Sequence, residues 1–252
     1  DRLSPELAAV LLFLSSEQYA DALEAASQIS NLNDNQNLIE SIIASHIIDL
    51  AKGNLSSIIS RGRERVETTR IPLTPIDEAA VLTMLHSLAS GIESMAQGTL
   101  NGLISNGEIL YPKSIFEKVK SLSTVVIESD TSSRIECSYS GIYHLASLLI
   151  AAYDGISESS LTSLPVPNGS EPEFWGKWLS FRANKFPYIW PNHRKALDDG
   201  FHRNGVSAIM VLPTGAGKTT VSSIKIASVL GQGKKVIFIA PTHALVEQLT
   251  AD

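Results

Sequence analysis

Apolar residues recur at helical spacing through most of the first 155 residues. Ser4 followed by Pro5 is typical of a helix start, because serine caps free backbone N–H groups and proline fits the first turn. Apolar positions three and four residues apart predict three helices. Their expected core residues are Leu7, Val10, Leu11, Leu14, Ala22, Leu23 and Ala26, then Leu38, Ile42, Ile43, Ile47 and Leu50, then Ala79, Leu82, Leu85, Leu88 and Ile92.

Polar and small residues separate these helices. An Asn- and Asp-rich stretch at 31–37 interrupts the first apolar pattern, and Gly53 with Asn54 ends the second. Thr74 and Pro75 begin the third, since proline again suits a first helical turn. The three arginines between the second and third helices are expected on a solvated surface rather than in a binding site. They are Arg61, Arg63 and Arg65.

Strand and linker signals follow the third helix. β-branched residues alternate with polar ones at 124–128 and 134–139, which predicts a short hairpin, and 142–153 returns to helical spacing. Residues 156–172 are rich in Ser, Pro and Gly, as linkers are. We therefore expect 1–155 to be a mainly helical accessory or regulatory domain and 156–172 to be a linker.

The pattern changes after this linker. Two continuous apolar runs, 207–212 and 235–240, are typical of strands buried on both faces of a parallel sheet. A polar, glycine-rich stretch at 213–220 and a helical pattern at 221–230 separate them. The order strand, loop, helix, strand indicates an α/β domain, which we expect to begin near residue 173 and to contain only part of its parallel sheet within 252 residues.

Composition adds limits on size and location. The chain has 252 residues, of which 44% are hydrophobic, enough for one large or two small domains. Its single cysteine, Cys137, cannot form an internal disulfide, which favours a reducing compartment, a cytoplasmic location and a buried, inert thiol. No run approaches the roughly 18 apolar residues of a membrane-spanning helix.

Charge is divided unevenly along the chain. Residues 1–170 contain 10 Lys and Arg against 20 Asp and Glu, whereas 171–252 contain 10 against 6, within a net charge of −6. A mildly basic C-terminal part suits a surface that follows phosphates. The acidic N-terminal part is a poor candidate for non-specific nucleic-acid binding.

The stretch between the two apolar runs has the residue types that bind a polyphosphate. Glycine lets the backbone bend so that several N–H groups converge on phosphate oxygens, and the start of a helix adds partial positive charge. Lys218 supplies a cation for the β- and γ-phosphates, and the Thr219 hydroxyl can hold Mg²⁺. Leu212 stands where the strict pattern has its first glycine. The predicted nucleotide-binding residues are Pro213, Thr214, Gly215, Ala216, Gly217, Lys218, Thr219 and Thr220.

This loop and the segment after it resemble two motifs of one family. PTGAGKT, from Pro213 to Thr219, resembles motif I of the superfamily 2 helicases, which include the DEAD/DEAH-box enzymes. APTHALVEQ, beginning at Ala240, is similar to their motif Ia. The resemblance implies a RecA-like P-loop domain from 173 to 252, ATP and Mg²⁺ as cofactors, and contact of Pro241 and Thr242 with the backbone of a nucleic-acid strand.

A weaker similarity lies just upstream. Residues 188–197 resemble the segment that precedes motif I in many of these helicases, where a glutamine reads the adenine edge. His193 occupies that position, and a base contact and a capping or packing role are both open for it. Trp190 and Phe186 are expected to be core aromatics rather than stacking platforms.

The resemblance implies an ATP-dependent helicase or translocase, that is, a hydrolase that acts on nucleic acid. Bacterial defence-system and restriction-type motors also have an extra region before the helicase core, and on that analogy alone we favour DNA over RNA. Such motors also need an acidic Mg²⁺-binding strand and a second lobe, so 1–252 alone is expected to be inactive. Two alternatives stay open: a protein-interaction module with a remnant phosphate loop, and a P-loop ATPase that acts on protein. The helical region is a candidate site for a protein partner.

Overall fold

The computed structural model describes the chain except for residues 1–3, 30–37, 69–74, 103, 106–107, 130–131, 204, 214, 241, 244–245 and 248–252. The chain forms two compact units. The first contains residues 1–164 and 179–194, and the second contains 165–178 and 195–252. The predicted division at 156–172 stays a prediction, although helical structure continues there through Ser159.

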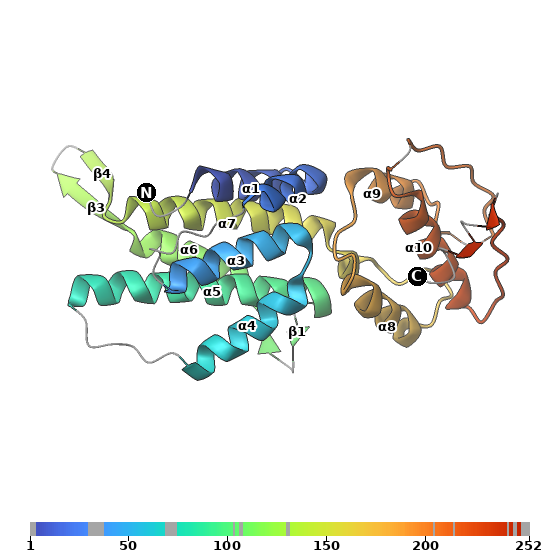
Figure 1. The fold of residues 1–252 in the computed structure, drawn as a ribbon, viewed down its shortest axis with the longest axis horizontal. Helices are drawn as coiled ribbons and strands as arrows, with labels where there is room; N and C mark the ends of the chain where they lie inside the picture. The colour runs from blue at the N-terminus through green and yellow to red at the C-terminus, as the bar shows by residue number, and fades with distance from the viewer. Residues whose placement is uncertain are drawn as a thin grey trace. The chain divides into compact units, whose positions relative to one another are not determined.

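The first unit is a helical bundle around one long helix, α5 (Figure 1). Helices α3, α4, α6 and α7 all pack against α5, and α1 packs against both α2 and α7. Their bounds are α1 Pro5–Ser15, α2 Tyr19–Gln28, α3 Leu38–Lys52, α4 Leu55–Thr68, α5 Ile76–Asn101, α6 Pro112–Leu122 and α7 Ser140–Ser159. Within the described residues, no helix has both the length and the hydropathy that crossing a bilayer requires.

Two antiparallel hairpins accompany these helices. β1 (Ile104–Ser105) pairs with β2 (Glu108–Ile109), and β3 (Thr124–Ser129) pairs with β4 (Ser132–Cys137). The second hairpin confirms the strand prediction at 124–128 and 134–139. The prediction of a buried Cys137 was wrong, because the thiol is exposed at the end of this two-stranded sheet.

The apolar stripes predict much of the helical core. Ser4 accepts a hydrogen bond from the Leu7 N–H as the predicted cap, and Leu7, Val10, Leu11 and Leu14 are buried. Two predicted core residues are instead exposed. Leu38 is the first residue of α3, and Leu23 lies beside the buried stripe of α2, which consists of Tyr19, Ala22 and Ala26.

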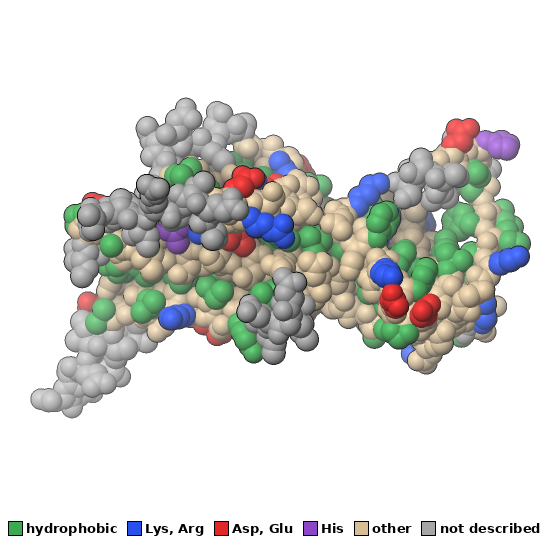
Figure 2. Space-filling model, turned by 90° about the horizontal axis from the view of Figure 1, so that it is seen from below, with side chains coloured by type: hydrophobic (Ala, Val, Ile, Leu, Met, Phe, Trp, Pro, Cys, Tyr) green, Lys and Arg blue, Asp and Glu red, His purple; other side chains and the backbone are tan. Residues whose placement is uncertain are grey.

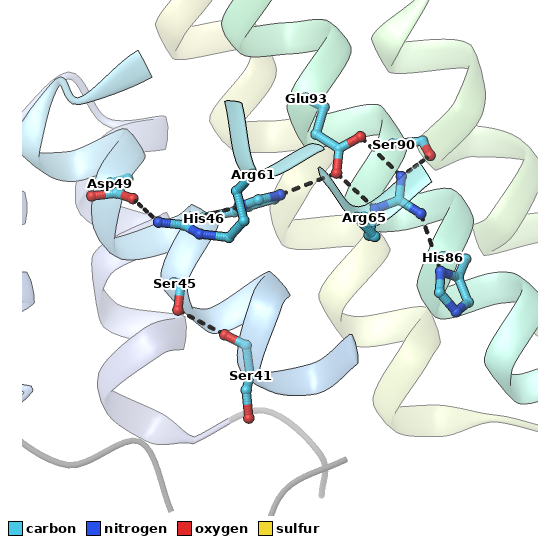
Figure 3. Close-up of polar contacts among 9 residues, drawn as sticks. All are labelled: Ser41, Ser45, His46, Asp49, Arg61, Arg65, His86, Ser90 and Glu93. Carbon is cyan, nitrogen blue, oxygen red and sulfur yellow. Dashed lines mark hydrogen bonds and ion pairs between the residues drawn. The ribbon is translucent and has the colours of Figure 1, made fainter. Parts of the chain in front are cut away.

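Helix α4 was not predicted, and its arginines correct the expectation of a solvated cluster. Arg63 is exposed, but Arg65 is buried and donates two hydrogen bonds of 2.9 Å to Glu93 on α5 (Figure 3). The Arg65 guanidinium also donates to Ser90 and to His86. A buried guanidinium needs acceptors for its N–H groups, and these three residues supply them from one face of α5.

A second arginine extends this polar network to α3. Arg61 donates to Nδ1 of the buried His46 at 2.9 Å and to Asp49 at 2.7 Å. The other ring nitrogen of His46 lies 3.2 Å from Glu93, so the network joins α3, α4 and α5 (Figure 3). Gly62 allows the close approach of α4, because a Cβ there would lie 2.6 Å from the Glu93 carboxyl carbon.

The segment at 187–189 is fixed to the helical bundle. The Tyr188 hydroxyl donates to the Leu50 carbonyl at 2.8 Å, and its ring stacks on Tyr19. Backbone hydrogen bonds of 2.8 Å join Leu161 to Pro187 and Ile189 to Ser159. The chain therefore leaves this segment from a fixed point in the first unit.

The second unit packs around helix α10 (Lys218–Leu230). Val221, Ile224 and Ala227 of this helix are buried. Ser170 donates to the Ser228 carbonyl at 2.8 Å, and Ser228 donates in turn to the His202 carbonyl at 3.0 Å. Helix α8 (Pro172–Ala183) and helix α9 (Pro191–Asp198) have residues in both units.

The prediction of two buried strands was wrong. Residues 207–212 and 235–240 pair with no strand in the described part of the chain, and Ile209 is 95% exposed. Val211, Ile237 and Ile239 are exposed as well, and Figure 2 shows hydrophobic side chains, in green, on the surface of this C-terminal part. Two apolar segments cannot cover both of their own faces, because a parallel sheet needs neighbouring strands and helices on both sides.

These segments carry a prediction for hydrogen exchange. In residues 1–252 expressed alone, the backbone amides of 207–212 and 235–240 are expected to exchange fast, because no ladder protects them. The buried parts of α5 and α7 are expected to exchange slowly. Mass spectrometry after timed deuterium labelling measures both, and slow exchange across the two apolar segments would contradict the structure.

Candidate phosphate-binding loop

The glycines of the loop have the backbone conformation that the sequence analysis expects. Gly215 and Gly217 have φ angles of +82° and +73°, a region that other residues rarely adopt. A Cβ at Gly215 would meet no atom within 4 Å, so the backbone angle and not local crowding requires glycine there. The loop therefore turns sharply just before helix α10.

Helix α10 begins directly at the predicted cation. Gly217 is its N-cap, and the Thr220 N–H donates to the Gly217 carbonyl at 3.0 Å. The first N–H groups of a helix have no partner within the helix, and its dipole places partial positive charge at this end. The 13 residues of α10 therefore present a helix start that suits an anion.

The Lys218 ammonium lies against the loop. Its Nζ donates to the Leu212 carbonyl at 2.7 Å and to the Pro213 carbonyl at 3.2 Å, and the side chain is exposed. The position where the strict pattern has glycine thus contributes its carbonyl oxygen. Phosphate oxygens are stronger acceptors for an ammonium than neutral carbonyls are, so this lysine can transfer its hydrogen bonds to a bound polyphosphate.

The remaining loop residues differ in exposure. Pro213 and Thr219 are exposed, Ala216 and Thr220 are partly buried, and Thr214 lies outside the described residues. An exposed hydroxyl one residue after the lysine suits a Mg²⁺ ligand. No group of three or more His, Cys, Asp or Glu that could hold a metal occurs in the described part of the chain.

His193 has a capping contact. Its Nδ1 accepts a hydrogen bond of 3.3 Å from the Trp190 N–H, and its ring stacks on the Trp190 indole at the start of α9. The imidazole is buried. This is the reciprocal contact that a third-position side chain makes with the residue before a helix. His193 belongs to the first unit and the loop to the second, and a base contact by His193 stays a prediction.

The predicted strand-contact residues follow the second apolar segment. Thr242 is exposed, and its carbonyl accepts a hydrogen bond of 3.2 Å from the Val246 N–H, as at the start of a helix. Pro241 lies outside the described residues. Of the two predicted contact residues, the structure therefore describes Thr242, which is exposed to solvent.

An exposed aromatic and basic surface at the C-terminal end of α8 and just after it was not predicted from the sequence. Phe181 is 74% exposed and Phe186 is 41% exposed, contrary to the expectation that Phe186 is a core residue. Two cations, Arg182 and Lys185, lie over the Phe186 ring. The missed signal is charge: residues 174–197 contain five Lys and Arg and no Asp or Glu.

Comparison with known proteins agrees with the motif resemblance. Residues 190–252 match the family model of the DEAD/DEAH box helicases. The match begins at Trp190 and contains the loop, helix α10 and Thr242. Searches of curated proteins and of solved structures found no match to the chain.

Proposed function

We propose that this chain, whose residues 190–252 match the family model of the DEAD/DEAH box helicases, forms the ATP-binding and strand-contacting part of a superfamily 2 motor. One observation carries the proposal. Within the matched segment, Lys218 begins α10 directly after two glycines of positive φ, with its ammonium against the loop backbone.

Different residues of the loop bind different parts of the nucleotide. Backbone N–H groups from Gly217 to Thr219 bind the phosphate oxygens, whereas the Ala216 N–H donates to the Pro213 carbonyl at 3.3 Å. Lys218 exchanges the Leu212 and Pro213 carbonyls for the β- and γ-phosphates. The Thr219 hydroxyl holds Mg²⁺. Bound ATP supplies the free energy of phosphoanhydride hydrolysis, and in the complete motor that energy drives movement along a strand, for which we favour DNA.

The helical unit and the segment after α10 have separate roles in this proposal. Thr242, with Pro241, contacts the sugar-phosphate backbone, which fixes the strand without reading its sequence. The helical bundle of the first unit holds a protein partner or regulates access to the motor. Its buried network and long α5 make it a rigid support for either role.

Strand contact at Thr242 gives the test of this proposal. Replacing Thr242 with Glu in the full-length protein places a negative charge where a phosphate is proposed to bind, so affinity for a single strand is expected to fall about tenfold. Basal ATP hydrolysis is expected to change little. Oligonucleotide anisotropy and a coupled ATPase assay measure the two quantities.

A control variant shows whether a loss of strand affinity comes from the added charge at Thr242 or from misfolding. Thr83→Glu changes an exposed threonine of α5 in the helical unit, far along the chain from the motif. It is expected to leave strand affinity unchanged. Unchanged strand affinity in Thr242→Glu, together with ATP hydrolysis that no strand stimulates, would favour an ATPase that acts on protein.

A further inference from the structure

The segment from α8 to α9 has an unusual composition. Residues 174–197 contain all three tryptophans of the chain, four further aromatic residues, and five Lys and Arg without a carboxylate. The rest of the chain has 15 Lys and Arg against 26 Asp and Glu, so this segment differs in sign from the remainder taken as a whole. Such a local excess of positive charge attracts polyanions.

Most aromatic residues of the segment have a structural role. Tyr188 stacks on Tyr19, and the buried Trp175 stacks on Trp178. Phe181 differs because 74% of its side chain is exposed at the C-terminal end of α8. A phenylalanine has no polar atom, so exposing this ring to water brings no compensating hydrogen bond.

Phe181 lies within a compact basic aromatic patch that we define as Phe181, Arg182, Lys185 and Phe186. Phe181 and Arg182 lie in the last turn of α8, and Lys185 and Phe186 follow the helix. The Lys185 and Phe186 N–H groups both donate to the Arg182 carbonyl, so the chain makes one further turn that keeps the four residues together. The Arg182 guanidinium lies 4.5 Å and the Lys185 ammonium 5.4 Å from the centre of the Phe186 ring.

The patch itself has a formal charge of +2, from Arg182 and Lys185. Arg194 of the same segment pairs with Glu17 and Glu158, whereas the structure places Arg182 over an aromatic ring. Pro187 packs on Gly53, and the residue before that glycine, Lys52, is exposed. The carboxylate of Asp49 on the same helix is held by Arg61.

We propose that the basic aromatic patch is a binding site for single-stranded nucleic acid, additional to the contact at Thr242. A base stacks on the exposed face of Phe181, and Arg182 and Lys185 hold the phosphates on either side of that base. Aromatic stacking together with positive charge is the combination that binds single strands without reading their sequence. We expect a duplex not to bind the patch, because the bases of a duplex are already stacked on one another. The proposal rests on the proposed function, since a strand must be the partner of the motor.

The test measures strand binding by the full-length protein without ATP. A fluorescent 20-nucleotide oligothymidylate is titrated with wild type and with Phe181→Ala, and the Kd is expected to rise about tenfold in the variant. Phe181→Trp is expected to keep the affinity, because indole also stacks. Its fluorescence, relative to wild type, is expected to be quenched as the strand binds.

The two cations are tested by salt dependence. Arg182→Ala combined with Lys185→Ala removes two phosphate contacts, so the slope of log Kd against log salt is expected to fall by about 1.4. The controls are Tyr111→Ala and Arg63→Ala, an exposed aromatic and an exposed cation elsewhere in the helical unit. Both are expected to bind like wild type.

Defined results would overturn the site. Equal affinity of wild type and Phe181→Ala, an unchanged salt slope, or unquenched tryptophan in Phe181→Trp would each show that no strand binds the patch. Loss of a protein partner without loss of oligonucleotide would identify the patch as a protein surface. The patch and the phosphate-binding loop are tested independently. Phe181→Ala is expected to keep basal ATP hydrolysis. If the phosphate-loop assignment failed, strand binding at the patch without ATP would still be expected.

Discussion

Alanine in place of Lys218 is expected to reduce ATP hydrolysis by the full-length protein at least about a hundredfold. The Lys218 Nζ is the cation that the structure holds against the loop, through the carbonyls of Leu212 and Pro213. Its removal leaves the negative charge on the β- and γ-phosphates without a partner. In such sites a single charge-stabilising group commonly contributes about a hundredfold to the rate. A coupled assay at saturating ATP measures the loss.

A lysine on the same helix provides the control. Lys225 also donates to a backbone carbonyl, that of Arg203, but it lies two turns further along α10. Lys225→Ala is expected to keep at least half of the turnover, since it removes an equal charge away from the loop. Near-normal turnover in Lys218→Ala would end the phosphate-loop assignment.

The second large effect concerns the helical unit. Glu93→Ala is expected to lower the free energy of unfolding by about 3 kcal/mol or more, because it leaves the buried Arg65 guanidinium and His46 without their shared acceptor. That is a large part of the stability of an ordinary domain. Urea unfolding of residues 1–252, followed by far-ultraviolet circular dichroism, measures it.

An exposed ion pair gives the comparison. The Lys113 Nζ lies 2.8 Å from Oδ1 of Asp154, and both side chains are exposed. Asp154→Ala is expected to lower the free energy of unfolding far less than Glu93→Ala does, because solvent screens the pair. If Glu93→Ala unfolded at the same urea concentration as Asp154→Ala, the network of Figure 3 would not stabilise the bundle.

The same network sets the response to acid. Burial alone would raise the pKa of Glu93, but hydrogen bonds from His46 and Arg65 outweigh burial and hold this pKa below its usual value of 4.5. A lowered carboxyl pKa stabilises the fold above the unfolded-state value, and that stabilisation is lost as the pH falls through the folded-state value. The stability difference between wild type and Glu93→Ala is therefore expected to narrow below pH 4.5.

Prediction from sequence succeeded where the signal is local. The stripe from Leu7 to Leu14 and the cap at Ser4 depend on residues within one helix, and both were predicted. The turn before α10 depends on Gly215 and Gly217 alone, so the loop geometry was predictable too. The helical pattern at 221–230 was predicted as well, and α10 begins three residues earlier, at Lys218.

Prediction failed where a residue depends on a distant partner. From the sequence alone, Arg65 was expected on the surface. Its acceptor, Glu93, lies 28 positions away on another helix. The apolar segments at 207–212 and 235–240 illustrate the opposite error. Their composition indicates buried strands, but burial needs neighbours that local pattern does not supply, and Ile209 is exposed.

Equilibrium binding of a fluorescent ATP analogue with Mg²⁺ tests the central claim most directly. The full-length protein is titrated beside Lys218→Ala and Lys225→Ala, and unlabelled ATP is then added to displace the analogue. We expect saturable, Mg²⁺-dependent binding by wild type and Lys225→Ala, and at least tenfold weaker binding by Lys218→Ala. No saturable binding by wild type, or equal affinity in all three proteins, would contradict the assignment of residues 213–220 as the nucleotide site.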